Sequence, residues 1–117
     1  MKVVLILNDP PYGSERGYNG LRLAYSLSNV APETKVTVFL MSDSVLCAKA
    51  GQRPPEGFYN IGKMLQRVIG GGGQVMLCGT CMDTRGITEK DVIEGTVRGT
   101  MDALAAITLE ADKVLVF

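Results

Sequence analysis

Two cysteines at C-x-x-C spacing are the residues of this sequence best placed to do chemistry. Cys78 and Cys81 lie in the stretch QVMLCGTCMDTRG, directly after an apolar run and shortly before Arg85. Two thiols at this spacing can cycle with a disulfide, supply half of a metal site, carry sulfur, or pack in the core. Cys78 is the better nucleophile, because backbone N–H groups at a strand end and the charge of Arg85 both favour thiolate over thiol.

Other catalytic chemistries lack the groups they need. The sequence contains no histidine, and its carboxylates form no obvious pair for acid–base catalysis. A zinc site needs four ligands, and Cys47 is the only further cysteine that could join the pair. Cys47 itself lies in an apolar helical stretch and is expected to pack in the core. We therefore expect no metal and no cofactor, and we assign any chemistry to sulfur.

The composition indicates one ordinary globular domain over residues 1–117. Hydrophobic residues make up 46% of the chain, and 12 basic residues balance 12 acidic ones. Zero net charge argues against a nucleic-acid surface, and no apolar run is long enough to cross a membrane. The N-terminal apolar run ends in Asn-Asp-Pro-Pro instead of a small-residue cleavage site, so we interpret it as a first strand. Because this run is not a signal peptide, we expect the protein in the cytoplasm, a compartment in which structural disulfides are rare.

Aliphatic runs alternate with helical patterns along the chain. The expected strands are residues 3–7, 35–41, 74–77 and 113–117, and a short fifth strand has room between residues 85 and 98. The expected helices begin after a cap at Ser14, after Ser42, near Ile61 and near Thr96, with a capping box from Thr88 to Asp91. This alternation predicts a three-layer α/β/α fold with a mainly parallel sheet of four to five strands.

The last helix has an unusual surface pattern. It is expected to run from about Thr96 to Leu109 and is apolar or small almost all round. Gly95, Gly99 and Ala103 recur every four residues, which would give a smooth stripe for close packing. The stripe fits either a second copy of the chain or the chain's own sheet.

The strand ends predict where a site would form. Asn8, Asp43 and the pair Cys78–Cys81 each follow a strand. Ligands of open α/β sheets collect at the carboxyl ends of the strands, so these segments should share one edge. Asn8, Asp43 and Thr80 are therefore predicted to line a substrate pocket, with Cys78, Cys81 and Arg85 as the reactive group.

At this point the residues resemble a known family. Cys78, seven intervening residues and Gly86, ending in Thr84-Arg85-Gly86, resemble the DsrE/DsrF/TusD family of sulfur-relay proteins, which places a cysteine eight residues before the glycine of Arg-Arg-Gly. The further matching segments are Asn8 and residues 11–15, 21–24, 39–43, 51–52, 59–61 and 111–115. Together they resemble the YchN-type branch of that family over nearly the whole chain.

The resemblance implies a function and partners. It implies a three-layer α/β/α fold, a cytosolic ring-like homo-oligomer of three or six copies, and a persulfide on Cys78 that passes between sulfur donor and acceptor proteins. Two departures affect this chemistry. Thr84 replaces the first arginine and leaves Arg85 to supply the charge. Cys81 is absent from the relay pattern but similar to the C-x-x-C of the YchN-type branch, and it could act as a resolving thiol.

Three functions stay open at this stage. The preferred one is a sulfur relay, with or without sulfurtransferase-like catalysis. A non-enzymatic ring that binds a small molecule or serves as a scaffold would leave the thiol incidental. A dithiol oxidoreductase would need a stable Cys78–Cys81 disulfide. Against that last reading, a thioredoxin-like pair begins a helix after an early strand, whereas this pair follows the third strand.

Overall fold

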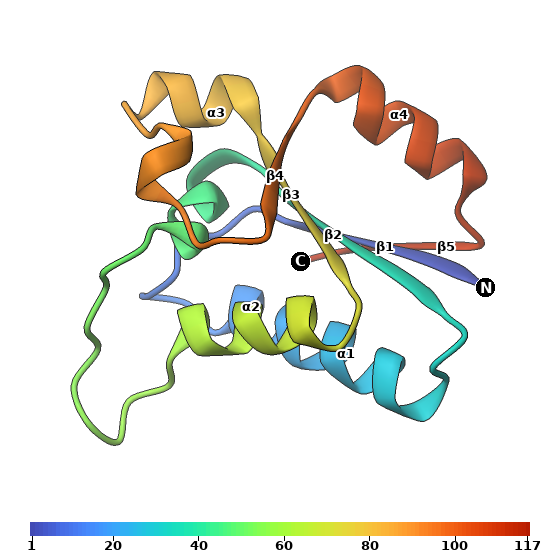
Figure 1. Cartoon of the computed structure of the whole chain (residues 1–117), viewed down its shortest axis with the longest axis horizontal. Helices are drawn as coiled ribbons and strands as arrows, with labels where there is room; N and C mark the ends of the chain where they lie inside the picture. The colour runs from blue at the N-terminus through green and yellow to red at the C-terminus, as the bar shows by residue number, and fades with distance from the viewer.

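The chain forms a five-stranded sheet with helices on both faces (Figure 1), and the computed structural model describes residues 1–117. All neighbouring strands are parallel, in the order β4-β3-β2-β1-β5. The strands are β1 (Lys2–Leu7), β2 (Lys35–Leu40), β3 (Gln74–Cys78), β4 (Thr96–Gly99) and β5 (Lys113–Val116). The helices are α1 (Arg16–Val30), α2 (Ile61–Gly70), α3 (Gly79–Thr84) and α4 (Met101–Glu110). The expected α/β fold is confirmed.

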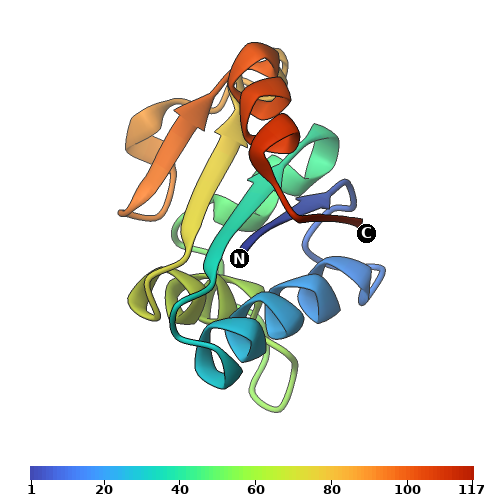
Figure 2. The ribbon, with the colours of Figure 1, turned by 90° about the vertical axis from the view of Figure 1, so that its right-hand side faces the viewer.

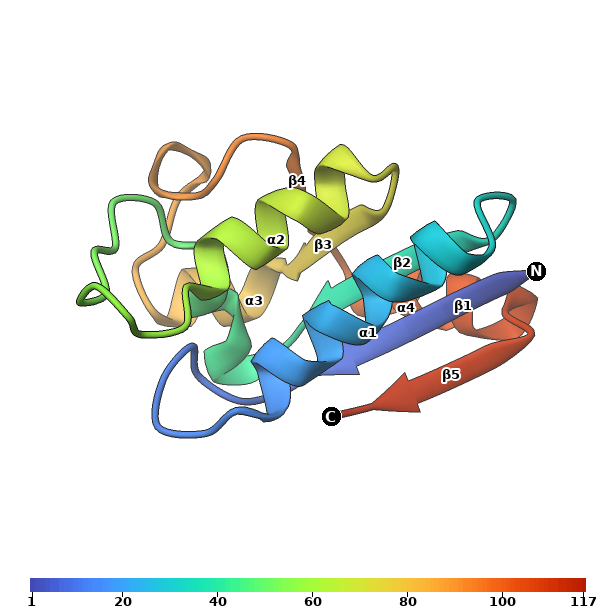
Figure 3. The same cartoon turned by 90° about the horizontal axis from the view of Figure 1, so that it is seen from below.

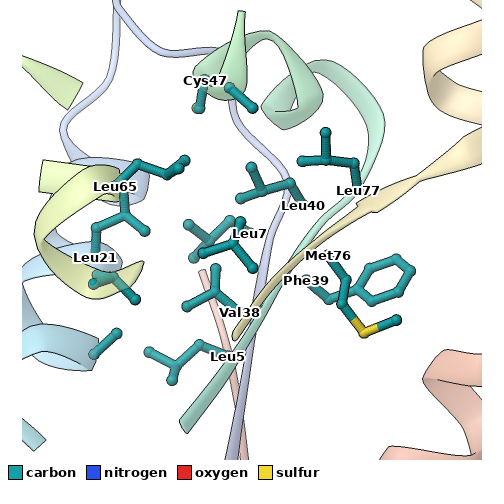
Figure 4. Close-up of a cluster of buried hydrophobic side chains, with 14 of the residues drawn as sticks. Leu5, Leu7, Leu21, Val38, Phe39, Leu40, Cys47, Leu65, Met76 and Leu77 are labelled. Atoms are coloured by element: carbon teal, nitrogen blue, oxygen red, sulfur yellow. The ribbon is translucent and has the colours of Figure 1, made fainter. Parts of the chain in front are cut away.

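The central strands are aliphatic because both of their faces are buried. β1, β2 and β3 contribute half of the buried core residues, and their side chains alternate between the two faces. Figure 4 shows Leu5, Leu7 and Val38 on the side of α1 and α2, while Phe39 and Met76 point the other way. The continuous apolar runs in the sequence therefore correspond to strands covered on both sides.

Helices α1 and α2 lie side by side over one face of the sheet (Figure 3). The buried positions of α2 are Ile61, Met64, Leu65 and Val68, which follow helical spacing. The side chain of Asn60 begins this helix by accepting the N–H of Lys63.

The start of α1 lies slightly later than predicted. Glu15 occupies the N-cap position, so Ser14, the expected cap, lies one residue earlier. The hydroxyl of Ser14 donates to Asp9 and also accepts the N–H of Arg16 at 3.3 Å. Ser14 therefore ties the loop after β1 to the first turn of the helix.

The prediction of a last helix beginning at Thr96 was wrong. Residues Thr96–Gly99 form β4, which pairs with β3 (Figure 2), and α4 begins only at Met101. Gly95 turns the chain with a φ of +94°, and the Thr100 side chain caps α4 by accepting the N–H of Ala103. The predicted glycine stripe therefore does not exist, because Gly95 and Gly99 lie outside the helix.

The second face of the sheet is covered by α4 and leaves apolar side chains exposed beside it. Val97 on β4 pairs with Met76, and Val116 on β5 pairs with Ile6, so both valines point to the α4 side. They are 45% and 65% exposed. This face therefore carries apolar surface at both edges of the sheet.

None of the helices is long and apolar enough to span a membrane.

A matched pair of glycines on α1 tests how closely this helix packs on the sheet. A Cβ at Gly20 would lie 2.6 Å from Cδ2 of the fully buried Leu7 and 3.2 Å from the ring of Phe117, whereas one at Gly17 would meet only Ile61 at 3.8 Å. We expect Gly20→Ala to lower the free energy of unfolding by about 1–3 kcal/mol through overpacking. Gly17→Ala should raise it by up to about 1 kcal/mol, because alanine favours the helix.

Urea denaturation of the two variants and the wild type measures both effects. If Gly20→Ala were as stable as Gly17→Ala, α1 would not pack against β1 as closely as the structure shows.

Candidate functional site

The two cysteines lie where β3 passes into α3. Cys78 is at once the last residue of β3 and the N-cap of α3, and its sulfur accepts the N–H of Cys81 at 3.3 Å. A disulfide joins Cys78 and Cys81, whose Cα atoms are 5.2 Å apart. The pair thus begins a helix, contrary to the expectation from the sequence. The six residues Gly-Thr-Cys-Met-Asp-Thr are mostly weak helix formers, which is why this helix was not predicted.

The second sulfur accepts a backbone N–H from a neighbouring segment. The N–H of Ser42 donates to Sγ of Cys81 at 3.2 Å. Ser42 begins the 3-10 helix Ser42–Ala48, and it is the only residue other than glycine with a positive φ, at +53°. This left-handed conformation costs a non-glycine residue free energy, and such strain concentrates at functional sites. Each sulfur therefore faces one N–H group that can stabilise a thiolate.

The side chain of Arg85 contacts the backbone of Cys81 and does not contact either sulfur. The guanidinium forms an ion pair with Asp43 at 2.8 Å and donates to the carbonyl oxygen of Cys81 at 3.1 Å. The structure thus brings Arg85, Asp43 and Cys81 together and fixes the end of α3 to the segment after β2. The positive charge predicted near the pair is present, but it contacts the carbonyl oxygen of Cys81 and not a sulfur.

A small cavity of about 140 Å³ opens beside Cys78. Its lining comprises Phe39, Cys78, Gly79, Thr80, Arg98, Gly99, Thr100 and Met101. The hydroxyl oxygen of Thr80 lies 3.4 Å from Sγ of Cys78, and Cys78 is 7% exposed. Of the residues predicted to line a pocket, Thr80 lines this cavity, whereas Asp43 and Asn8 do not. Asn8 instead donates through its side chain to the carbonyl of Phe117 and links the ends of β1 and β5.

Arg98 is the residue at this site that the sequence reading missed. It lines the cavity and forms two hydrogen bonds of 2.9 and 2.7 Å with Asp83, which raise the pKa of Arg98 and lower that of Asp83. Its guanidinium packs over Gly79, where a Cβ would lie 2.7 Å from Cζ. The predicted helix from Thr96 to Leu109 included Arg98, so its place beside Cys78 was not expected. The signal available was Thr96-Val97, a β-branched pair directly after Gly95.

The third cysteine is part of the core. Cys47 is fully buried, and its thiol lies 3.8 Å from the carbonyl oxygen of Asp9. Burial raises the pKa of Cys47 to about 12, so the thiol stays neutral and unreactive at neutral pH. No three His, Cys, Asp or Glu side chains gather closely enough to hold a metal ion. The reactive sulfur of the molecule is therefore confined to Cys78 and Cys81.

Comparisons with known proteins match the whole chain. The model of the DsrE/DsrF-like family matches residues 1–117. Protein YchN of Escherichia coli K12 is 46% identical over 116 residues, which cover 99% of this chain and 98% of that protein. An uncharacterised protein of Methanocaldococcus jannaschii is 38% identical over the full length of both chains. The crystal structure of YchN superposes with a TM-score of 0.95, covering 100% of this chain and 99% of that one.

Alkaline titration tests the burial of Cys47. Its pKa of about 12 in the folded protein exceeds the ordinary value of 9.0, so the folded state keeps a proton that the unfolded state loses. Stability is therefore expected to fall as the pH rises from about 9 towards 12, by about 1.4 kcal/mol per pH unit from this group. Urea denaturation across this range, compared with Cys47→Ala, isolates the contribution. An identical slope in the variant would contradict the assignment.

Proposed function

We propose, given that this chain belongs to the DsrE/DsrF-like family, that it carries sulfane sulfur as a persulfide on Cys78. The observation that carries this proposal is the placement of the Cys78 sulfur. It lies at the end of a central strand and borders a cavity, and it accepts the N–H of Cys81. A thiolate at this position is stabilised and still has space beside it for one more sulfur atom.

Loading begins from the reduced pair. The thiolate of Cys78 attacks the outer sulfur of a donor persulfide, the donor's S–S bond breaks, and the donor leaves as a thiolate while Cys78 gains the sulfur. An acceptor thiol can then remove that sulfur in the same way. Donor and acceptor are proposed to be other proteins, as in the relay members of the family.

Cys81 gives the persulfide a second fate. The disulfide between Cys78 and Cys81 indicates that the two sulfurs are within bonding reach. The thiolate of Cys81 can therefore attack the inner sulfur of the persulfide, which releases hydrosulfide and forms the disulfide. Sulfur delivery then depends on whether an acceptor reaches the outer sulfur before Cys81 reaches the inner one.

A dithiol oxidoreductase is the second candidate function. The disulfide favours it, and so does the position of the pair at the beginning of α3. In that function both cysteines are needed for every turnover. In the sulfur relay only Cys78 is needed, because Cys81 takes part only in release. Single cysteine variants therefore separate the two functions.

We also propose that copies of the chain assemble through the α4 face into the ring of three or six that the family resemblance implies. Val97 and Val116 leave apolar surface at both edges of this face. Burying such surface between copies is favourable by about 25 cal/mol per Å².

The sulfur relay is tested by loading the reduced protein from a small persulfide donor and measuring intact mass. Wild type and Cys81→Ser should gain about 32 Da per sulfur atom, whereas Cys78→Ser should gain none. Wild type should then lose hydrosulfide and end about 2 Da lighter than the reduced protein, while Cys81→Ser keeps its persulfide.

Three results would contradict the relay. Loading of Cys78→Ser at the wild-type rate would remove Cys78 as the carrier. Disulfide reductase activity lost in both single variants, without sulfur uptake in either, would favour the oxidoreductase. No change of mass in any variant would favour a non-enzymatic binding protein.

Assembly is tested by placing charge on the exposed valine of β5. We expect Val116→Lys to shift the protein to smaller species in light scattering coupled to size exclusion, because an unpaired lysine is costly to bury. Val30→Lys is the matched control, since Val30 lies at the end of α1 and is 86% exposed. Equal masses for the two variants would exclude β5 from the interface.

A further inference from the structure

We propose that the cavity beside Cys78 is a binding site for hydrosulfide, and that the oxidised protein is loaded with sulfur there directly. The inference rests on the proposed persulfide on Cys78 and adds its substrate class, a small inorganic sulfur species. In this reaction the Cys78–Cys81 disulfide is the oxidant, so no donor persulfide is needed.

The size of the cavity selects a small reactant. Its volume is about 140 Å³, well below the roughly 300 Å³ at which pockets for drug-sized ligands begin. Cys78 is 7% exposed, so a small reactant reaches this sulfur more readily than a bulky thiol does. A species of one or two heavy atoms fits within the space.

The cavity also decides which sulfur is attacked. Cys78 lines it and Cys81 does not, so a nucleophile held there meets the sulfur of Cys78 and makes Cys81 the leaving group. The leaving thiolate forms where the N–H of Ser42 already donates to Sγ of Cys81 at 3.2 Å. Arg85 lies close to the same residue, because it donates to the carbonyl oxygen of Cys81. Both groups stabilise the negative charge on departure.

The lining favours an anion of low charge. Arg98 is the only charged residue in the lining, and its charge is balanced by Asp83 through two hydrogen bonds. Thr80 and Thr100 add hydroxyl groups, while Phe39 and Met101 are apolar. For a doubly charged sulfur oxyanion, the hydration free energy lost on entry would exceed the free energy gained from contacts in the cavity. Hydrosulfide is a soft and singly charged ion, so it loses less hydration free energy.

The reaction balances without a further reactant. Hydrosulfide attacks Sγ of Cys78, a new S–S bond forms between them, and the bond from Cys78 to Cys81 breaks. The electron pair of the broken bond leaves on Cys81 as a thiolate. The incoming sulfur is oxidised to the outer sulfur of a persulfide, and Cys81 is reduced. The step is the reverse of hydrosulfide release, so the direction follows the hydrosulfide concentration.

The test treats the oxidised protein with sulfide in large excess over protein and, separately, with glutathione at the same concentration, and follows intact mass over time. We expect sulfide to add about 34 Da, with the persulfide mapped to Cys78 after alkylation and digestion, and glutathione to react at least about tenfold more slowly per thiolate. Formation of the persulfide on Cys81, or equal rates for the two nucleophiles, would overturn the proposal.

A variant pair tests the cavity itself. Met101 lines the cavity yet is 60% exposed, so Met101→Trp enlarges a lining side chain without disturbing the core. We expect it to slow the sulfide reaction at least about tenfold, because access to the reacting atom is lost. Leu109→Trp is the control, since Leu109 lies at the far end of the same helix and is 88% exposed. Equal rates in the two variants would exclude the cavity as the route.

Failure here is distinguishable from failure of the sulfur relay. The same samples, once reduced, are loaded from a persulfide donor. Uptake on Cys78 by the reduced protein, together with an inert oxidised protein, would overturn hydrosulfide loading and leave the relay intact. No uptake in either state would overturn both.

Discussion

The site depends on the turn from β3 into α3, where one residue serves two structures. Cys78 ends a strand that pairs with β2 on one side and β4 on the other, and its sulfur caps the helix that follows. Because the strand is held on both edges, the sulfur has little freedom to move. Cys81 is then fixed by the first turn of α3, which brings it within reach of Cys78.

The neighbouring strands complete this turn from both sides. The segment after β2 supplies the N–H of Ser42 and the carboxylate of Asp43, and β4 supplies Arg98 and the backbone of Gly99. A side chain at position 99 would press on Phe39, so the glycine keeps space beside Cys78. Parallel strands deliver these groups together because their carboxyl ends meet at one edge.

Much of the fold was predictable because β1, β2 and β3 are buried on both faces and leave continuous aliphatic runs in the sequence. Thr96–Gly99 was not, since four residues at a sheet edge are too short to show a period, and the helix that follows extended the apparent helical pattern. The cysteine pair was predicted from its spacing, its place at the end of an apolar run and the nearby Arg85. Arg98 was missed because the predicted last helix was extended over it, although the β-branched pair Thr96-Val97 was a signal for a strand. The contact of Ser42 with Cys81 depends on backbone conformation, which leaves no local signature.

The two hydrogen bonds to the sulfurs have an evolutionary consequence, because both come from main-chain N–H groups. Replacing a side chain does not remove such a donor, so most amino-acid changes at position 42 preserve the polarity around the sulfurs. Only proline lacks the donor. These two hydrogen bonds are thus insensitive to most side-chain changes at position 42 and sensitive to a change of the backbone geometry.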